Sequence, residues 1–134
     1  MDWKLEVVVV PVSDVDRAKA FYSEQVGFNV DVDHQASETY RIVQLTPPGS
    51  GCSIVVGTGL GDMPPGSIKG LQLVVDDIDA AHAELVERGV EVTPVRHMED
   101  GEWVEGKGGR WNAFVHFTDP DGNAWAVQER PAGE

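Results

Sequence analysis

Several features of secreted, membrane-bound or zinc-binding proteins are absent or rare in this sequence. Cys52 is the single cysteine, so the chain can form neither an internal disulfide nor a cysteine-based zinc site. No run of 18 apolar residues occurs, so we expect no membrane-spanning segment. Residues 1–4 lack the basic stretch and apolar run that begin a signal peptide. These absences favour a cytoplasmic protein that does not enter a membrane.

Basic residues are also scarce. The chain has 10 lysines and arginines against 23 aspartates and glutamates, which gives a net charge of −13. Such a surface repels phosphate backbones, so we expect no nucleic acid as a partner. Two explanations of the charge remain open from the sequence: it keeps the protein in solution, or it attracts a cationic ligand.

One pattern is present twice. Residues 10–22 (VPVSDVDRAKAFY) recur as residues 73–85 (LVVDDIDAAHAEL), at an offset of 63 positions. Each copy joins an apolar strand, an aspartate suited to capping a helix, and a helix that contains several alanines. The repeat indicates two like modules that face each other, and we expect a pocket at the seam between them.

The first module is predicted to contain one helix and four strands. Ser13 or Asp14 caps the helix, because its side-chain oxygen can accept a hydrogen bond from a free N–H of the first turn. Gly27 ends the helix, because glycine tolerates a positive φ. The predicted strands cover residues 5–12, 28–33, 40–46 and 52–57. Residues 57–67, with four glycines and two prolines, are the predicted linker.

The second module is predicted to repeat this order. Its helix begins at Asp77 and ends at Gly89. Its strands cover residues 68–75, 90–95, 112–118 and 124–129, with a tight turn at residues 119–123 (DPDGN). Residues 97–110 are a long polar, glycine-rich excursion for which we predict no regular structure.

The order βαβββ, found twice, predicts an α+β fold. We expect two βαβββ modules in tandem that form a curved, open barrel-like mixed sheet with the helices on the outside. Module 1 covers about residues 1–58 and module 2 about residues 68–130. Both belong to a single domain, residues 1–134, because this is the length of one domain.

The motifs resemble those of the vicinal oxygen chelate superfamily, which contains glyoxalase I, bleomycin resistance proteins and extradiol dioxygenases. The resemblance rests on residues 12–18 (VSDVDRA), residues 75–81 (VDDIDAA) and residues 117–123 (FTDPDGN), the last followed by Trp125 and Glu129. Together these motifs span nearly the whole chain in the right order. The resemblance implies the same fold and a homodimer.

The resemblance also implies four positions for the ligands of a divalent metal, which metal-dependent members hold with histidine and glutamate. In this chain these positions fall on Val7, Gly70, the segment 54–56 (IVV) and Ala126. None of these side chains can coordinate a metal. We therefore predict no metal at the usual place and no cofactor. Glyoxalase I activity and extradiol cleavage would both lack their Lewis acid.

Strand alternation predicts which side chains line the pocket instead. Gln72 and Gln128 share the parity of Gly70 and Ala126, so both amides are predicted to contact a ligand. The alternative is that they bond to each other or to the backbone. His116 lies in the middle of a predicted strand. It either points into the pocket as an acid, base or ligand contact, or it is an interior histidine with satisfied hydrogen bonds.

Trp103 and Trp111 flank the segment 106–109 (GKGG). A glycine loop between two indoles is suited to closing over an aromatic or cationic guest, so both tryptophans are predicted to contact the ligand. The alternative is an exposed turn with a tryptophan at a dimer contact.

Three functions remain open from the sequence. The first is a glyoxalase/bleomycin-resistance-like protein that binds a small organic molecule, cationic or aromatic, without the usual divalent metal. The second is an enzyme of the same superfamily, a lyase, isomerase or dioxygenase, with a non-standard active site that uses His116. The third is a domain retained for dimerisation or regulation, without a ligand.

Overall fold

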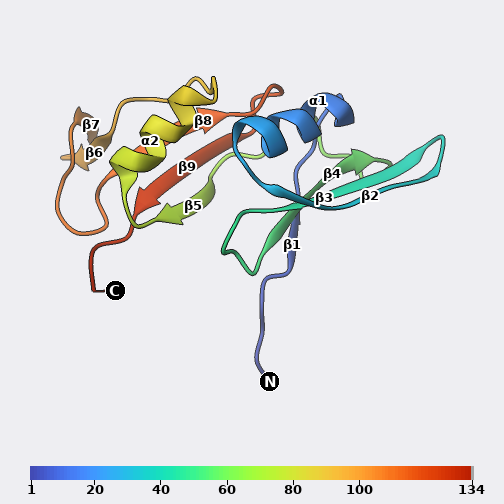
Figure 1. Ribbon diagram of the computed structural model, residues 1–134, viewed down its shortest axis with the longest axis horizontal. Helices are drawn as coiled ribbons and strands as arrows, with labels where there is room; N and C mark the ends of the chain where they lie inside the picture. The colour runs from blue at the N-terminus through green and yellow to red at the C-terminus, as the bar shows by residue number, and fades with distance from the viewer. Residues whose placement is uncertain (134) are drawn as a thin grey trace. The chain divides into compact units, whose positions relative to one another are not determined.

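The computed structural model describes residues 1–133, which contain two α-helices, one π-helical segment and nine strands (Figure 1). The strands form two mixed sheets, one of four strands and one of five. The predicted α+β fold is confirmed. The chain divides into two compact units: Met1–Ile68 with Asp119–Asn123, and Lys69–Thr118 with the chain from Ala124 onward.

The first unit packs one helical segment against a four-stranded sheet. Strand β1 pairs in parallel with β4, while β2, β3 and β4 are antiparallel neighbours. The elements are β1 (Val7–Val9), α1 (Val15–Ala20), η1 (Phe21–Gln25), β2 (Asn29–Ser37), β3 (Tyr40–Thr46) and β4 (Ser53–Thr58). The core of the unit includes Tyr22, which stacks on Phe28 with ring centroids 5.7 Å apart.

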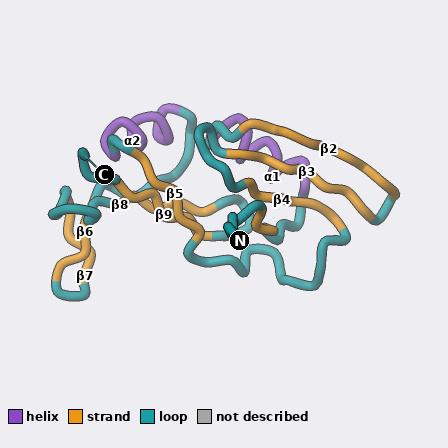
Figure 2. The backbone as a smooth tube through the Cα atoms, turned by 90° about the horizontal axis from the view of Figure 1, so that it is seen from below, coloured by secondary structure: helices purple, strands orange, loops and turns teal. Residues whose placement is uncertain are grey.

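The second unit has a five-stranded sheet in the order β5-β9-β8-β6-β7, with β5 parallel to β9. Its elements are β5 (Leu71–Val75), α2 (Ile78–Glu87), β6 (Arg96–Glu99), β7 (Glu102–Glu105), β8 (Phe114–Thr118) and β9 (Ala124–Glu129). The hairpin of β6 and β7 projects beyond the other strands, on the side away from α2 (Figure 2).

Both helices begin where the repeat predicts. Asp14 Oδ1 accepts a hydrogen bond from Arg17 N, and Asp77 Oδ1 accepts one from Ala80 N, each at 3.0 Å. The two capping residues have nearly the same backbone, with φ of −134° and −140°. Each carboxylate satisfies an N–H that the first helical turn leaves without a partner. The internal repeat therefore places the same helix-capping hydrogen bond at the start of both helices.

The predicted strand over residues 90–95 is wrong. Pro94 has no N–H to give to a ladder, and in this segment Thr93 pairs with His116: Thr93 N donates to the His116 carbonyl at 3.0 Å. The strand lies further on, in the excursion predicted to be irregular, as the β6–β7 hairpin. Its turn has positive φ at Asp100 (50°) and Gly101 (80°), as a two-residue type I′ turn requires.

Some other boundaries also differ from the prediction. Strand β1 has three residues, because it pairs with β4 only from Val7 to Val9. Strand β2 extends to Ser37, since its pairing with β3 continues to Tyr40. Strand β5 begins at Leu71, opposite Trp125 of β9. In each case the partner strand, and not the local sequence, sets the end.

The turn at residues 119–123 groups with the first unit, although it joins β8 to β9. Asn123 is fully buried and its amide bonds to three groups: Ile68 N donates to Oδ1, and Nδ2 donates to the Pro11 carbonyl and to Asp119. Asp119 also accepts a hydrogen bond from the hydroxyl of Tyr22 at 2.7 Å. Buried polar groups are thus paired with one another.

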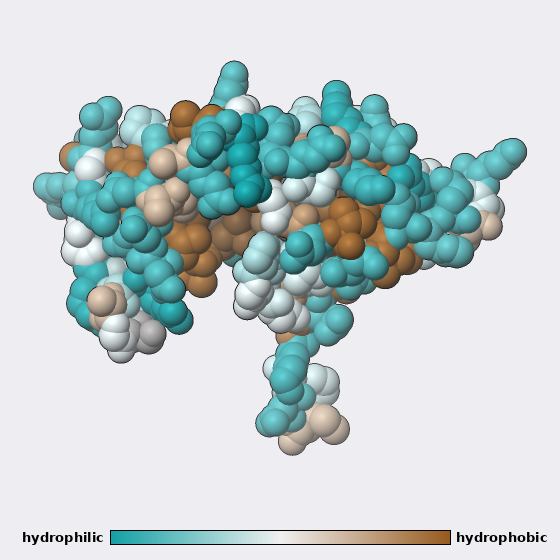
Figure 3. Space-filling view, in the orientation of Figure 1, coloured by the Kyte–Doolittle hydropathy of each residue, from teal (hydrophilic) through white to brown (hydrophobic). Residues whose placement is uncertain are grey.

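Hydrophilic residues cover most of the face shown in Figure 3, and hydrophobic residues form smaller patches in each unit. Within residues 1–133 no helix combines the length and the apolar character needed to cross a bilayer.

Candidate functional site

One face of the five-stranded sheet is not covered by α2. Along β8, Val115 and Phe117 are buried while Phe114 and His116 are half-buried. Helix α2 packs on β8 and β9, and side chains alternate between the faces of a strand. His116 therefore lies on the face away from α2. We call this the open face; its residues are Gln72, Val74, Phe114, His116, Ala126 and Gln128, which are register partners across β5, β9 and β8.

The β6–β7 hairpin contributes an aromatic ring to this face. The Trp103 ring lies 4.8 Å from that of His116 and 5.4 Å from that of Phe114, both in an edge-to-face arrangement. Arg96, on β6, places its guanidinium carbon 4.9 Å from the centre of the Trp103 ring. We call these four residues the aromatic cluster. Trp103 is still 39% exposed, so part of its surface is free to contact a planar molecule.

Burial and Arg96 together favour the neutral form of His116. The guanidinium nitrogen Nη2 lies 3.2 Å from Nδ1 of His116. A guanidinium can only donate, so Nδ1 must accept, and the ring proton of a neutral imidazole is then on Nε2. Burial lowers the pKa of His116 below its usual 6.5, and the positive charge of Arg96 lowers it further. The imidazole is therefore neutral at pH 7, with Nε2–H as its donor.

A chain of amides lies beside this cluster. Gln72 Nε2 donates to Gln128 Oε1 at 2.6 Å, and Gln128 Nε2 donates to the carbonyl of Trp111 at 2.7 Å. The two amides thus bond to each other and to the backbone, which is the alternative left open by the sequence. Trp111 has a positive φ of 62°, a conformation that costs a non-glycine residue on the order of 1 kcal/mol. This backbone conformation directs the Trp111 carbonyl toward Gln128.

The glycine segment 106–109 is attached at several points. Lys107 forms ion pairs with Glu129 at 3.1 Å and with Asp79 at 3.2 Å, and the hydrogen bond to Glu129 raises the pKa of Lys107. His97 Nδ1 lies 2.8 Å from the carbonyl of Gly106. Trp103 and Trp111 have different roles: the ring of Trp103 lies in the aromatic cluster, whereas Trp111 contributes its carbonyl and leaves its ring exposed.

The positions at which the resemblance implies metal ligands do not fit a metal. Val7 on β1 and Ala126 on β9 carry hydrocarbon side chains, and Gly70 has no side chain. On β4, Val55 pairs with Val9 and shares its face. A divalent cation needs nitrogen, oxygen or sulfur donors, and these residues supply none. Elsewhere in residues 1–133, no group of three or more histidine, cysteine, aspartate or glutamate side chains is arranged to hold a metal.

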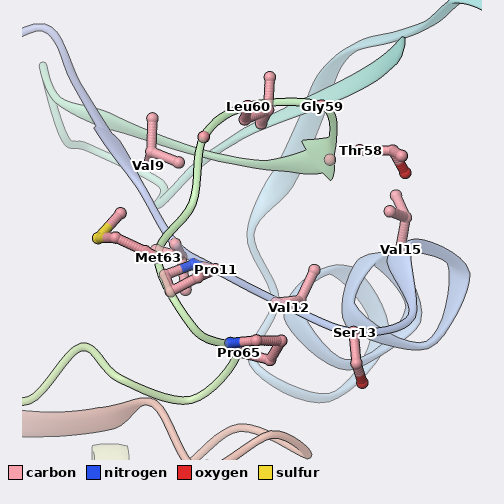
Figure 4. Close-up of a pocket in the computed structure, with 13 residues that line it drawn as sticks. Val9, Pro11, Val12, Ser13, Val15, Thr58, Gly59, Leu60, Met63 and Pro65 are labelled. Carbon is pink, nitrogen blue, oxygen red and sulfur yellow. The ribbon is translucent and has the colours of Figure 1, made fainter. Parts of the chain in front are cut away.

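A separate pocket lies within the first unit, between the end of β1 and the segment that follows β4 (Figure 4). Its volume is about 300 Å³, and its walls are mostly apolar, with Val9, Val12, Val15, Leu60 and Met63 among them. Ser13, at its rim, is bound to Asp121 through its hydroxyl at 2.6 Å. None of the sequence-predicted site residues lines this pocket. No titratable side chain lines this pocket, so it offers a ligand apolar contact but no acidic, basic or charged group.

Three residues of the candidate site were missed by the sequence reasoning: Arg96, Phe114 and Asn112. Asn112 bonds to both the N–H and the carbonyl of Met98, at 2.9 Å each, and so ties β6 to the chain before β8. Arg96 was missed because the β6–β7 hairpin was missed. Its signal was present, since an Asp-Gly pair between two short alternating segments is typical of a type I′ hairpin.

Residues 4–127 match the family model described as Glyoxalase/Bleomycin resistance protein/Dioxygenase superfamily. Among curated proteins, the chain is 26% identical to the uncharacterized protein YetH of Bacillus subtilis (strain 168), over 94% of this chain and 98% of YetH.

Two solved structures from Streptomyces sp. CB03234 are similar to this chain. TnmS3, an antibiotic binding protein, is 37% identical with a TM-score of 0.77, over 96% of this chain and 97% of TnmS3. A glyoxalase/bleomycin resistance protein is 38% identical with a TM-score of 0.74, over 94% of this chain and 100% of that protein.

Proposed function

Because the chain belongs to the Glyoxalase/Bleomycin resistance protein/Dioxygenase superfamily, we propose that it binds a small organic molecule with an aromatic part, without the usual divalent metal. The ligand contacts the open face, with Gln72, His116, Gln128, Trp103 and Trp111 among the residues around it. The observation that carries the proposal is the aromatic cluster, in which a partly exposed indole stands beside a neutral imidazole. An antibiotic binding protein among the relatives supports the same class of function.

The open face suits such a ligand for physical reasons. Val74 and Trp103 leave apolar surface exposed, and covering apolar surface contributes about 25 cal/mol per Å². The Nε2–H of His116 provides a directed donor next to that surface. Binding sites combine this kind of apolar lining with a few polar groups that fix orientation. The absence of donors at Val7, Val55, Gly70 and Ala126 supports binding without a metal.

The test measures ligand binding by quenching of tryptophan fluorescence, with planar aromatic compounds as probes. Trp103→Leu is expected to weaken binding by about fivefold, because stacking on an indole contributes on the order of 1 kcal/mol. The matched control is Trp3→Phe, since Trp3 is 89% exposed near the chain start. Equal affinity of wild type and Trp103→Leu would place the ligand elsewhere, and the apolar pocket of the first unit is then the next candidate.

A metal analysis tests the other half of the proposal. Protein purified without chelator is expected to contain far less than one equivalent of nickel, zinc, manganese or iron. A stoichiometric metal that is retained through dialysis would contradict the proposal.

An enzyme with a non-standard site is the second candidate function. The observation that favours it is the contact of Arg96 with Nδ1 of His116, together with the lowered pKa of this imidazole, because the neutral ring can then donate from Nε2–H to negative charge that develops on a substrate oxygen. Turnover of a bound compound that is lost in His116→Gln, with binding retained, would favour this candidate over a binding protein.

The proposal includes a homodimer that acts in the cytoplasm as one domain per chain. Strand β1 is an edge strand of its sheet. Val7 on this strand is exposed, and so are Trp3 and Leu5, which precede it. Exposed apolar edges favour pairing with another chain. Sedimentation equilibrium is expected to give twice the chain mass, and removal of residues 1–5 is expected to shift the equilibrium toward monomer. A single-chain mass at all concentrations would contradict this.

A further inference from the structure

Arg96 has no carboxylate partner among residues 1–133, whereas four other arginines of this acidic chain have one. The ion pairs are Arg17 with Asp121, Arg41 with Asp33 and Asp16, Arg88 with Glu84, and Arg130 with Asp76. Glu105 stands opposite Arg96 in the β6–β7 register, yet the two side chains form no ion pair. In a chain with 23 acidic residues, Arg96 is thus a cation at the open face with no carboxylate partner in the part of the chain that the structure describes.

The hydrogen bonds of Arg96 are also incomplete. Its Nη2 donates to the neutral Nδ1 of His116, and its plane lies near the ring of Trp103. Its Nε is buried and has no hydrogen-bond partner among residues 1–133. Leaving a buried donor unpaired costs on the order of 1–3 kcal/mol, and the cost is larger for a charged group. A ligand oxygen at the accessible N–H groups of the guanidinium would supply the counter-charge that the described residues do not, while Nε itself stays buried.

We infer that the ligand carries an anionic oxygen on its planar aromatic ring, as in an aromatic carboxylate or an ionised phenol, and that Arg96 receives it. The inference rests on the proposed function and names the class of ligand. A guanidinium presents its donors in a planar fork, which matches a carboxylate and stacks well on aromatic rings. The Nε2–H of His116 adds a second donor, and Trp103 contacts the ring.

The net charge of −13 acts over longer distances than the charge of Arg96 at the aromatic cluster. Charges in water are screened beyond roughly 8 Å at physiological ionic strength, so the acidic residues that lie farther than this from the aromatic cluster have a weak effect on a bound ligand. Arg96 acts at contact distance in a half-buried site, where its interaction is much stronger. Contact charge therefore determines which ligands are retained, and the preference at the aromatic cluster is for an anion rather than a cation.

The experiment compares four naphthalene probes of similar aromatic area: naphthoate, the neutral naphthamide, the cationic naphthylmethylammonium, and 2,4-dinitro-1-naphtholate, whose nitro groups keep its hydroxyl ionised. Affinities are measured by tryptophan quenching and by calorimetry at pH 7.5. Naphthoate is expected to bind at least about tenfold more tightly than naphthamide, and naphthylmethylammonium most weakly. Binding of dinitronaphtholate as well shows that any anionic oxygen suffices, whereas its failure narrows the ligand to carboxylates.

Variants assign the preference to a residue. Arg96→Gln is expected to abolish the difference between naphthoate and naphthamide, and Arg96→Lys to retain part of it through charge alone. Arg130→Gln, which removes an exposed arginine paired with Asp76, is the matched control and is expected to keep the full difference. Circular dichroism verifies that each variant is folded, and the four-probe comparison on the wild type stands without any variant.

The outcomes separate this inference from the proposed function. If naphthamide or naphthylmethylammonium binds as well as naphthoate, the anionic class is wrong and aromatic binding stands. If Arg96→Gln keeps the preference for naphthoate, Arg96 is not the receiving group. If none of the four probes binds, the proposed aromatic ligand fails together with the inference.

Discussion

Arg96 and His116 depend on each other at the open face. The guanidinium cannot accept a hydrogen bond, so it selects the neutral tautomer of His116 that accepts at Nδ1. His116 in turn gives Arg96 its one hydrogen bond to a side chain among the described residues. The pair therefore presents two donors to the open face, a guanidinium edge and an imidazole N–H. Such donors suit an oxygen-bearing ligand better than a cationic one.

The first prediction concerns the titration of His116. Its pKa is lowered by burial and by Arg96, so the unfolded chain binds a proton at higher pH than the folded chain does. The contribution of this histidine to the free energy of unfolding is therefore present above the unfolded pKa of about 6.5 and is lost as the pH falls through the folded pKa. NMR titration of the imidazole is expected to give a pKa below 6.5.

The variant Arg96→Gln tests the cause of that shift. Removing the guanidinium charge is expected to raise the pKa of His116 toward 6.5 while leaving the effect of burial. Arg130→Gln is the control and is expected to leave the titration unchanged. A pKa of 6.5 or above in the wild-type protein would mean that the neutral tautomer is not favoured by the fold.

The β6–β7 hairpin is held to its sheet mainly by side chains. Strand β6 pairs with β8 at one residue pair, Arg96 with Phe114. Asn112 adds two hydrogen bonds to Met98. His97 bonds to the Gly106 carbonyl, just after β7, and to Glu99 on its own strand. Both bonds raise the pKa of His97. Strand β7 is the edge of this sheet, so it pairs with β6 on one side and with no strand of the sheet on the other. An element held this way opens more readily than a central strand.

The second prediction is that Asn112→Ala loosens this hairpin selectively. Each lost hydrogen bond is worth about 1 kcal/mol, so amide exchange of residues 96–105 is expected to accelerate by roughly 10–30-fold. Exchange in β3 and β4 is expected to stay as in the wild type. Because Trp103 lies on this hairpin, binding of aromatic probes should weaken in parallel.

Asn29→Ala is the matched control for that experiment, since Asn29 is exposed on β2. It removes an asparagine side chain from a strand of the first unit. The interpretation fails if Asn112→Ala accelerates exchange throughout the chain, or if it leaves residues 96–105 protected.

At the scale of the whole molecule, chain connectivity crosses the division into two units. The turn at residues 119–123 groups with the first unit, while β8 and β9 on either side of it belong to the second. The chain cannot complete the first unit without the turn that joins two strands of the second. This connectivity favours cooperative unfolding, as expected for a single domain.

The third prediction follows from that arrangement. Thermal unfolding followed by tryptophan fluorescence and by circular dichroism is expected to give one coincident transition. Asn123→Ala removes the three buried hydrogen bonds of its amide and is expected to lower the free energy of unfolding by about 2–4 kcal/mol, with the transition still single. Two separated transitions, in the wild type or in the variant, would show that the units unfold independently.

Local chemistry is what the sequence by itself determined. Asp14 and Asp77 mark the helix starts because a capping carboxylate acts within three residues. The predicted bounds of β3 and β9 are confirmed, and the family was identified from motifs that are local as well. The Asp100-Gly101 turn was equally readable, and it was missed because the segment around it is polar.

Only the tertiary structure decided which side chains meet. Gln72 and Gln128 are 56 residues apart in the chain and bond directly, so their amides are already partnered. Arg96 and His116 are 20 residues apart, and their contact depends on a hairpin whose position is set by Asn112 and by a single pair with β8. The sequence placed His116 in the middle of a strand and left open which face of the sheet it occupies, because alternation within one strand does not say what covers each face. The sequence also gave no information about Arg96, because which strand lies beside β8 is determined by packing between distant segments.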